Sequence, residues 1–127
     1  MRQQLFARQT CLILLLAWVG LSTTANANEP TPIKATIVSQ GSGFYTISVS
    51  VRHGDEGWDH YADRWEVIDS EGNVLATRLL QHPHVDEQPF TRSLSALRLP
   101  PTLDAVIIRV HDSKHGYGRR KIKLERP

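Results

Sequence analysis

One segment of the chain alternates strictly between large apolar and small polar side chains, and this pattern limits the folds open to it. Residues 44–52 read FYTISVSVR, and the apolar side chains at every second position are Tyr45, Ile47, Val49 and Val51. Successive side chains of a β-strand point to opposite faces of a sheet, so a repeat of two buries one face and leaves the other in water. The segment is therefore predicted to be a strand of an antiparallel sheet with one buried and one solvent-exposed face.

Six further β-prone segments occur at short, regular spacing, with Gly, Pro, Asn and Asp between them. They cover residues 33–39, 64–68, 74–80, 90–97, 105–111 and 119–124. We find no segment with the 3.6-residue period of an amphipathic helix. The pattern predicts an all-β fold, a seven-stranded antiparallel sandwich of the immunoglobulin or fibronectin type III kind, with Trp65 where such domains bury a tryptophan. A small barrel is the alternative.

The first 27 residues have the three parts of a secretory signal peptide. Arg2 and Arg8 precede an apolar stretch at residues 11–21, and Ala25-Asn26-Ala27 forms a cleavage site. The apolar stretch is shorter than the roughly 20 residues that span a bilayer, although an uncleaved anchor remains the alternative. We therefore expect a cleaved signal at residues 1–27, an N-terminal tether at 28–32 and one β-sandwich domain at 33–127.

Charge and cysteine content change once the signal is set aside. Two of the 15 Lys+Arg, Arg2 and Arg8, lie in it, so the remaining basic residues equal the 13 Asp+Glu in number. A neutral domain has no general attraction to nucleic acid or to an anionic membrane. Cys11, the one cysteine, also lies in the signal, which leaves the domain without a disulfide. We expect an exported protein whose partner is another protein of its compartment or a small ligand, not nucleic acid or a membrane.

All six histidines fall in three of the predicted loops. In an antiparallel sandwich, successive connections lie at alternate ends. Residues 53–63, 82–89 and 111–118 should therefore share one end, where they bring together His53, His60, His82, His84, His111 and His115. The loops at the opposite end contain no histidine.

A divalent metal site is the chemistry that this grouping favours. Neutral imidazole is a good ligand for Zn(II), Cu(II), Ni(II) and Fe(II), and carboxylates complete such sites. His82-Pro83-His84 places two imidazoles at i and i+2, on the same side of an extended chain. The preferred metal ligands are His82, His84 and His111, and the alternates are His53, His60 and His115. Asp112 and Asp86 are the carboxylates expected to orient them, and Asp112 could instead bind the ion itself. The absence of Cys and Met after residue 27 disfavours Cu(I), so the expected cofactor is Cu(II) or Zn(II).

Two other interpretations remain open. In the first, the same loops form a metal-free binding or accessory module, with Trp58, Tyr61 and Tyr117 as surface anchors and the histidines bonded to loop backbone and carboxylates. Trp58 or Tyr61 could instead fold inward over the core. In the second, the protein is an enzyme, and a neighbouring pair such as Asp59-His60 supplies a general base and the group that orients it. Because no nucleophile motif accompanies such pairs, we predict no catalytic residue and favour a protein that is not an enzyme.

Three stretches together carry a resemblance to a known family. They contain GWDHYADRW (residues 57–65), HPHVDEQPFTRSL (82–94) and HDSKHGYG (111–118). They resemble a small family of uncharacterised, signal-bearing proteobacterial periplasmic proteins with an immunoglobulin-like fold. The resemblance implies a periplasmic location but no activity, cofactor or catalytic residue. Superoxide reductases also bind metal through loop histidines on such a scaffold, but they need a cysteine ligand, so their activity does not carry over. Periplasmic copper carriers use an N-terminal histidine, whereas the cleaved chain would begin with Asn28.

Overall fold

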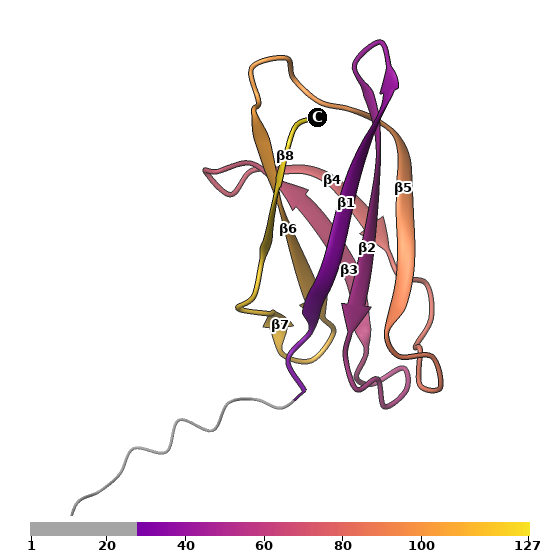
Figure 1. Ribbon diagram of the computed structural model, residues 1–127. Coiled ribbons are helices and arrows are strands. Elements are labelled where there is room, and N and C mark those ends of the chain that lie inside the picture. Colours follow the sequence, from indigo (N-terminus) through magenta and orange to yellow (C-terminus); the bar gives the residue numbers. More distant parts are fainter. Residues whose placement is uncertain (1–27) are drawn as a thin grey trace, which may run out of the picture.

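The alternating segment forms strand β2 (Phe44–Arg52), the middle strand of a three-stranded sheet between β1 (Thr31–Gly41) and β5 (Phe90–Arg98). The computed structural model describes residues 28–127 (Figure 1), so the predicted signal peptide lies outside the described residues. Tyr45, Ile47, Val49 and Val51, the alternating apolar side chains of β2, are at most 6% exposed. On the other face, Ser48 pairs with Ser93 of β5 at 2.6 Å between hydroxyl oxygens, in contact with solvent. The predicted division into a buried and a wet face is confirmed.

The second sheet has the order β4 (Val74–Leu79), β3 (Ala62–Ile68), β6 (Ala105–Asp112), and both β7 (Gly116–Tyr117) and β8 (Ile122–Glu125) pair with β6. All pairings are antiparallel. The sheet of β1, β2 and β5 faces the sheet that contains β3, β6 and β8. This is the two-sheet division of immunoglobulin-like sandwiches. The predicted all-β sandwich is confirmed. Over residues 28–127 it has eight strands rather than seven, because two residues of the last predicted loop pair briefly with β6.

The apolar core lies between the two sheets. Trp65 on β3 is fully buried, as predicted, and packs in one cluster with Phe90 at the start of β5 and Ile108 on β6. Burying one large apolar side chain stabilises a fold by about 1.5–3 kcal/mol. Since residues 28–127 contain no cysteine, no disulfide joins the two sheets there, and this cluster packs them against each other.

At the end of the sandwich whose loops contain no histidine, the hairpin turns depend on glycine and on side-chain hydrogen bonds. The β1–β2 hairpin turns through Gly41, Ser42 and Gly43, whose φ angles of 84°, 56° and 81° lie in the region that favours glycine. In the β3–β4 hairpin, Asp69 Oδ1 accepts the Asn73 N–H at 2.9 Å. Both turns lie between β-prone segments that Gly, Asn and Asp separate in the sequence.

The β2–β3, β4–β5 and β6–β7 loops gather at the other end of the sandwich (Figure 1). Hydrogen bonds join them directly, since the His84 N–H on the β4–β5 loop donates to Asp55 on the β2–β3 loop at 2.7 Å. The prediction that the three histidine-bearing loops share one end is confirmed. Over the described residues, the chain contains no helix that is long and apolar enough to cross a membrane.

Candidate metal centre

Two strands from opposite sheets end in polar residues that continue their buried faces. His53 follows Val49 and Val51 at the same spacing of two just after β2, and it is 2% exposed. Asp112 follows Ile108 and Val110 in the same way at the end of β6, and it is fully buried. A pleated strand that keeps its alternation must direct both side chains into the space between the sheets.

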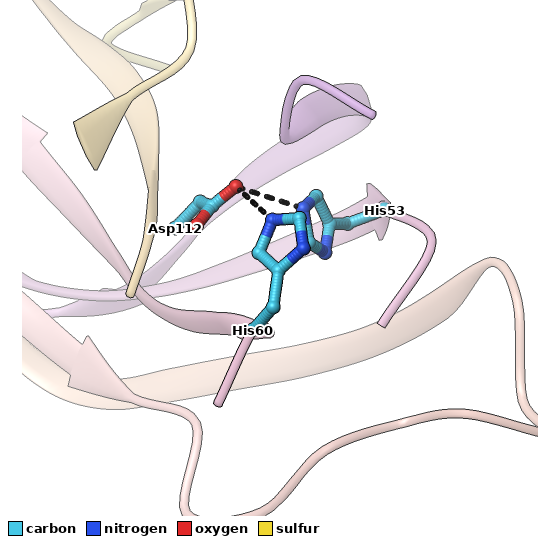
Figure 2. Close-up of side chains that lie close together, drawn as sticks. All are labelled: His53, His60 and Asp112. Atoms are coloured by element: carbon cyan, nitrogen blue, oxygen red, sulfur yellow. Dashed lines mark hydrogen bonds and ion pairs between the residues drawn. The ribbon is translucent and has the colours of Figure 1, made fainter. Parts of the chain in front are cut away.

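A carboxylate oxygen of Asp112 is the meeting point of two imidazoles. His53 Nε2 lies 3.0 Å from Asp112 Oδ2, and His60 Nε2 lies 2.7 Å from the same oxygen. Figure 2 shows the two rings approaching this oxygen from one side. The rings meet edge to face with 4.9 Å between centroids, and His60 is 4% exposed. One donor atom from each residue lies within 4.8 Å of the other two, so the three residues could hold a metal ion.

The second oxygen of Asp112 is fixed by the turn that follows β6. Asp112 Oδ1 accepts the backbone N–H groups of Lys114 at 2.6 Å and His115 at 3.0 Å. Burial alone would raise the pKa of Asp112, but these N–H groups, the His60 hydrogen bond and the charge of His53 outweigh it and lower the pKa to about 2. Asp112 is therefore a carboxylate at neutral pH.

A second buried carboxylate holds the far side of the His53 ring. Asp55 Oδ1 lies 2.5 Å from His53 Nδ1 and accepts the Ala62 N–H at 2.9 Å, while its other oxygen accepts the His84 N–H. Burial alone would raise the pKa of Asp55, but the His53 hydrogen bond and these two N–H groups lower it overall. Asp55 thus fixes the orientation of the ring and adds a second negative charge to the interior.

The two buried carboxylates, Asp55 and Asp112, need a compensating positive charge. Burial alone would lower the pKa of His53, but its hydrogen bonds and Coulomb attraction to Asp55 and Asp112 raise it overall. Buried carboxylates are costly unless they are paired. Either a proton on an imidazole or a divalent ion bound by the imidazoles can supply the compensating positive charge.

The surroundings of His60 connect the buried group to solvent. Its Nδ1 lies 3.4 Å from Glu56 Oε2 and 3.5 Å from the Asn28 amide nitrogen. The exposed His115 ring lies edge to face with His60, with 4.8 Å between centroids. The β6–β7 turn therefore places a third imidazole at the solvent side of the buried group.

The preferred ligands of the sequence analysis lie elsewhere at the same end. The His84 ring stacks on Phe90 at 3.8 Å between centroids, and its Nε2 lies 2.9 Å from Arg92 Nη2. The exposed His82 ring lies 4.5 Å from His84, and its Nδ1 contacts the Pro83 carbonyl at 3.1 Å. These two rings are neighbours, as expected for the His-Pro-His segment, but neither belongs to the group around Asp112.

His111 points to the outer face of β6. Its Nδ1 lies 2.7 Å from Asp63 Oδ1 and 3.1 Å from Arg64 Nη1, and its ring meets Tyr117 edge to face. Asp86 is exposed on the β4–β5 loop. Shared coordination by His82, His84 and His111 stays a prediction. The fold instead brings together two of the alternate ligands, His53 and His60, and one of the two carboxylates expected to orient them.

A signal for this group was present in the sequence and was overlooked. The buried positions of β2 have odd numbers from 45 to 51, and His53 is the next in that series. The buried positions of β6 run through 106, 108 and 110, and Asp112 is the next. Its neighbour His111 falls on the opposite face. The phase of the alternation therefore favoured Asp112 over His111 as an inward-facing side chain.

The predicted surface anchors have different environments. Trp58 is 68% exposed and meets Tyr61 edge to face at 5.7 Å, so it does not cover the core. Tyr61 is half-buried. The Tyr117 hydroxyl donates to Glu66 Oε1 at 2.9 Å, and Arg109 lies over its ring at 4.0 Å. Trp58 is the most accessible of the three aromatic side chains.

Comparison with known proteins finds a relative that matches about three quarters of this chain. The chain is 39% identical over 97 residues to a protein of Halomicrobium mukohataei (strain ATCC 700874 / DSM 12286 / JCM 9738 / NCIMB 13541) described as "Putative lipoprotein". The match covers 76% of this chain and 47% of the relative, so the chain spans about half the length of the curated relative it matches. No family model matches the chain. No solved structure matches it either.

Proposed function

We propose that this chain is an exported protein that binds one divalent metal ion, Zn(II) or Cu(II), through His53, His60 and Asp112. The observation that carries the proposal is the approach of two buried imidazole Nε2 atoms to one oxygen of a buried carboxylate, at 3.0 and 2.7 Å. Donor atoms that share an ion with bonds near 2.0–2.2 Å lie roughly 3–4 Å apart. Small side-chain movements would therefore suffice to admit the ion.

The hydrogen bonds behind these donor atoms suit a bound metal. A histidine that binds metal through one nitrogen usually donates its other N–H to a carboxylate or carbonyl, which fixes the tautomer and raises the basicity of the ring. Asp55, 2.5 Å from His53 Nδ1, occupies this position. On binding, the ion would replace the hydrogen shared between His53 Nε2 and Asp112, so uptake of metal would release protons.

The donor set narrows the choice of metal. Two imidazoles and one carboxylate suit Zn(II), with an open fourth position for water or His115, and they suit the nitrogen and oxygen geometry of Cu(II). The same set occurs in non-haem Fe(II) sites, so Fe(II) belongs in any comparison. Residues 28–127 contain no Cys or Met to favour Cu(I).

Export is supported by two separate observations. Residues 1–27 have the composition of a secretory signal, and the relative from Halomicrobium mukohataei is described as a "Putative lipoprotein". Cleavage after Ala27, a periplasmic location and membership of the proteobacterial family that the motifs resemble are parts of the proposal. A partner in that compartment would be a protein or small ligand that meets the loops around the centre.

A metal-free binding module is the second candidate. It is favoured by the fact that both His53 nitrogens already face carboxylates, because an imidazolium held between Asp55 and Asp112 would satisfy the charges without an ion. The exposed Trp58 would then be the recognition anchor.

Calorimetric titration of the purified protein with Zn(II), Cu(II) and Fe(II) separates the two candidates. We expect one saturable site tighter than about 10 µM, which corresponds to a free energy near −7 kcal/mol. His60→Ala should weaken it beyond the 10- to 100-fold loss that removal of an outer hydrogen-bond partner causes. Absence of saturable binding by all three ions would leave the metal-free module.

A further inference from the structure

A second site, distinct from the buried group, lies beside the His-Pro-His segment. A hollow of about 190 Å³ opens between the end of β4, the β4–β5 loop and the start of β5. Its polar walls come from Arg78, Gln81, His82, His84 and Arg92. The hollow therefore has two guanidinium groups on its walls, and none of its lining residues is a carboxylate.

Both guanidinium groups are held in place by backbone carbonyls. Arg78 donates from Nε to the Ser93 carbonyl at 2.9 Å and from Nη1 to the Leu79 carbonyl at 2.6 Å. Arg92 donates from Nη1 to the Thr91 carbonyl at 2.8 Å. A guanidinium has five N–H donors, so each group keeps further donors for a ligand.

His84 does not neutralise the charge of Arg92. Arg92 Nη2 lies 2.9 Å from His84 Nε2, and since guanidinium can only donate, that nitrogen accepts and the hydrogen sits on Nδ1. Nδ1 is buried and has no hydrogen-bond partner among the described residues. Burial, followed by the positive charge of Arg92, lowers the pKa of His84 and keeps the ring neutral.

The nearest carboxylate offers weak competition for Arg92. Glu87 Oε2 lies 3.5 Å from Arg92 Nη2, but the Glu87 side chain is 59% exposed. Exposed ion pairs contribute little and are screened by salt. A better-placed anion can therefore displace Glu87.

We propose that this hollow binds a small oxyanion, namely inorganic phosphate, sulfate or the carboxylate of a small ligand, between Arg78 and Arg92. Guanidinium groups match the geometry of such anions through paired, charge-assisted hydrogen bonds. The volume of about 190 Å³ is below the roughly 300–1,000 Å³ of pockets for larger organic ligands. The anion site does not depend on a metal in the buried group.

The test is a calorimetric titration of inorganic phosphate into EDTA-treated protein at low ionic strength, with sulfate and acetate as parallel titrants and chloride as the control anion. Saturable binding of phosphate or sulfate, with chloride inert, is expected, and the acetate titration separates carboxylate ligands from tetrahedral ones. Arg78→Gln and Arg92→Gln should each weaken binding about tenfold or more, since each removes charge-assisted hydrogen bonds.

Arg98→Gln is the matched control, because Arg98 lies at the far end of β5 against Phe44 and should leave the affinity unchanged. Circular dichroism of Arg78→Gln, a change at a half-buried position of β4, guards against loss of fold as the cause. Wild-type affinity in both arginine variants, or no saturation up to about 20 mM phosphate, overturns the proposal. It is also overturned if phosphate binds only after Zn(II) is added and binding disappears in His60→Ala, because the anion then belongs to the metal centre.

Discussion

His53 and Asp112 join the two sheets at one end of the sandwich, with 3.0 Å between His53 Nε2 and Asp112 Oδ2. One residue follows β2 in the first sheet and the other ends β6 in the second. Both side chains are almost completely buried. Each lies at the end of the row of inward-facing apolar side chains on its strand. The contact therefore lies where the core gives way to the loops, and a ligand bound there would hold both sheets and the β2–β3 loop.

Asp55→Asn should weaken metal binding by about 10- to 100-fold, although Asp55 is not among the proposed ligands. The carboxylate at 2.5 Å from His53 Nδ1 fixes the tautomer that leaves Nε2 free to bind, and an amide does this less well. Zn(II) affinity by calorimetry provides the measurement. Asp59→Asn, in the same loop but exposed, is the control and should retain the wild-type affinity. Equal affinities in the two variants would exclude the proposed orienting role.

His111→Ala should leave Zn(II) affinity within about threefold of the wild type, a change of under 1 kcal/mol. The ring lies on the outer face of β6 against Asp63 and Tyr117, away from the buried group. His53→Ala, measured beside it, should abolish tight binding. A large loss in His111→Ala would instead restore His111 to the ligand set expected from the sequence.

Much of this arrangement could be predicted because it depends on periodicity and chain direction alone. The alternation of residues 44–52 defined β2 with its bounds, and antiparallel connectivity placed three loops at one end. Neither inference needs side-chain detail. The brief pairing of Gly116–Tyr117 with β6 was missed because two residues are too few to show any period.

Residue type alone could not show which histidines meet in the buried group. His82 and His84 have the spacing of a metal-binding pair, but His84 stacks on Phe90 and receives a hydrogen bond from Arg92, and a one-dimensional pattern contains neither contact. His60 is buried through the path of an irregular loop, which has no period to follow. Only His53 and Asp112 could have been found, from the phase of their strands.

The acid sensitivity of the fold should depend in part on Glu66. It is 4% exposed on β3 and accepts hydrogen bonds from Arg109 at 2.7 Å, Tyr117 at 2.9 Å and Arg64 at 3.2 Å. Burial alone would raise the pKa of Glu66, but these three partners lower it below its ordinary value. The folded-state pKa is then below the unfolded one, so the stabilisation is complete above the unfolded pKa and is lost as pH falls through the folded pKa.

The corresponding variant is Glu66→Gln, which should lower the free energy of unfolding by about 1–3 kcal/mol near pH 7. The gap between wild type and variant should narrow as the pH falls through the lowered folded-state pKa of Glu66, because the wild-type carboxylate is then being protonated. Urea unfolding at a series of pH values measures it, with the exposed Glu71→Gln as control. A gap that stays constant with pH would show that Glu66 acts through packing rather than charge.

Trp65 and Trp58 should differ sharply in their contribution to the free energy of unfolding. Trp65→Ala should cost about 3–5 kcal/mol, because it removes a fully buried side chain from between the sheets. Trp58→Ala should change stability by no more than about 0.5 kcal/mol, since Trp58 is 68% exposed. Urea denaturation of both variants provides the comparison. Similar losses in the two would mean that the Trp58 loop packs on the core.

The most direct test of the central claim is the anomalous diffraction of crystals grown with Zn(II), recorded on both sides of the zinc absorption edge. We expect one strong peak within about 2.0–2.2 Å of His53 Nε2, His60 Nε2 and an Asp112 carboxylate oxygen. A peak at His82 and His84 instead, or no peak between these three residues, would contradict the assignment of this buried group as a metal centre.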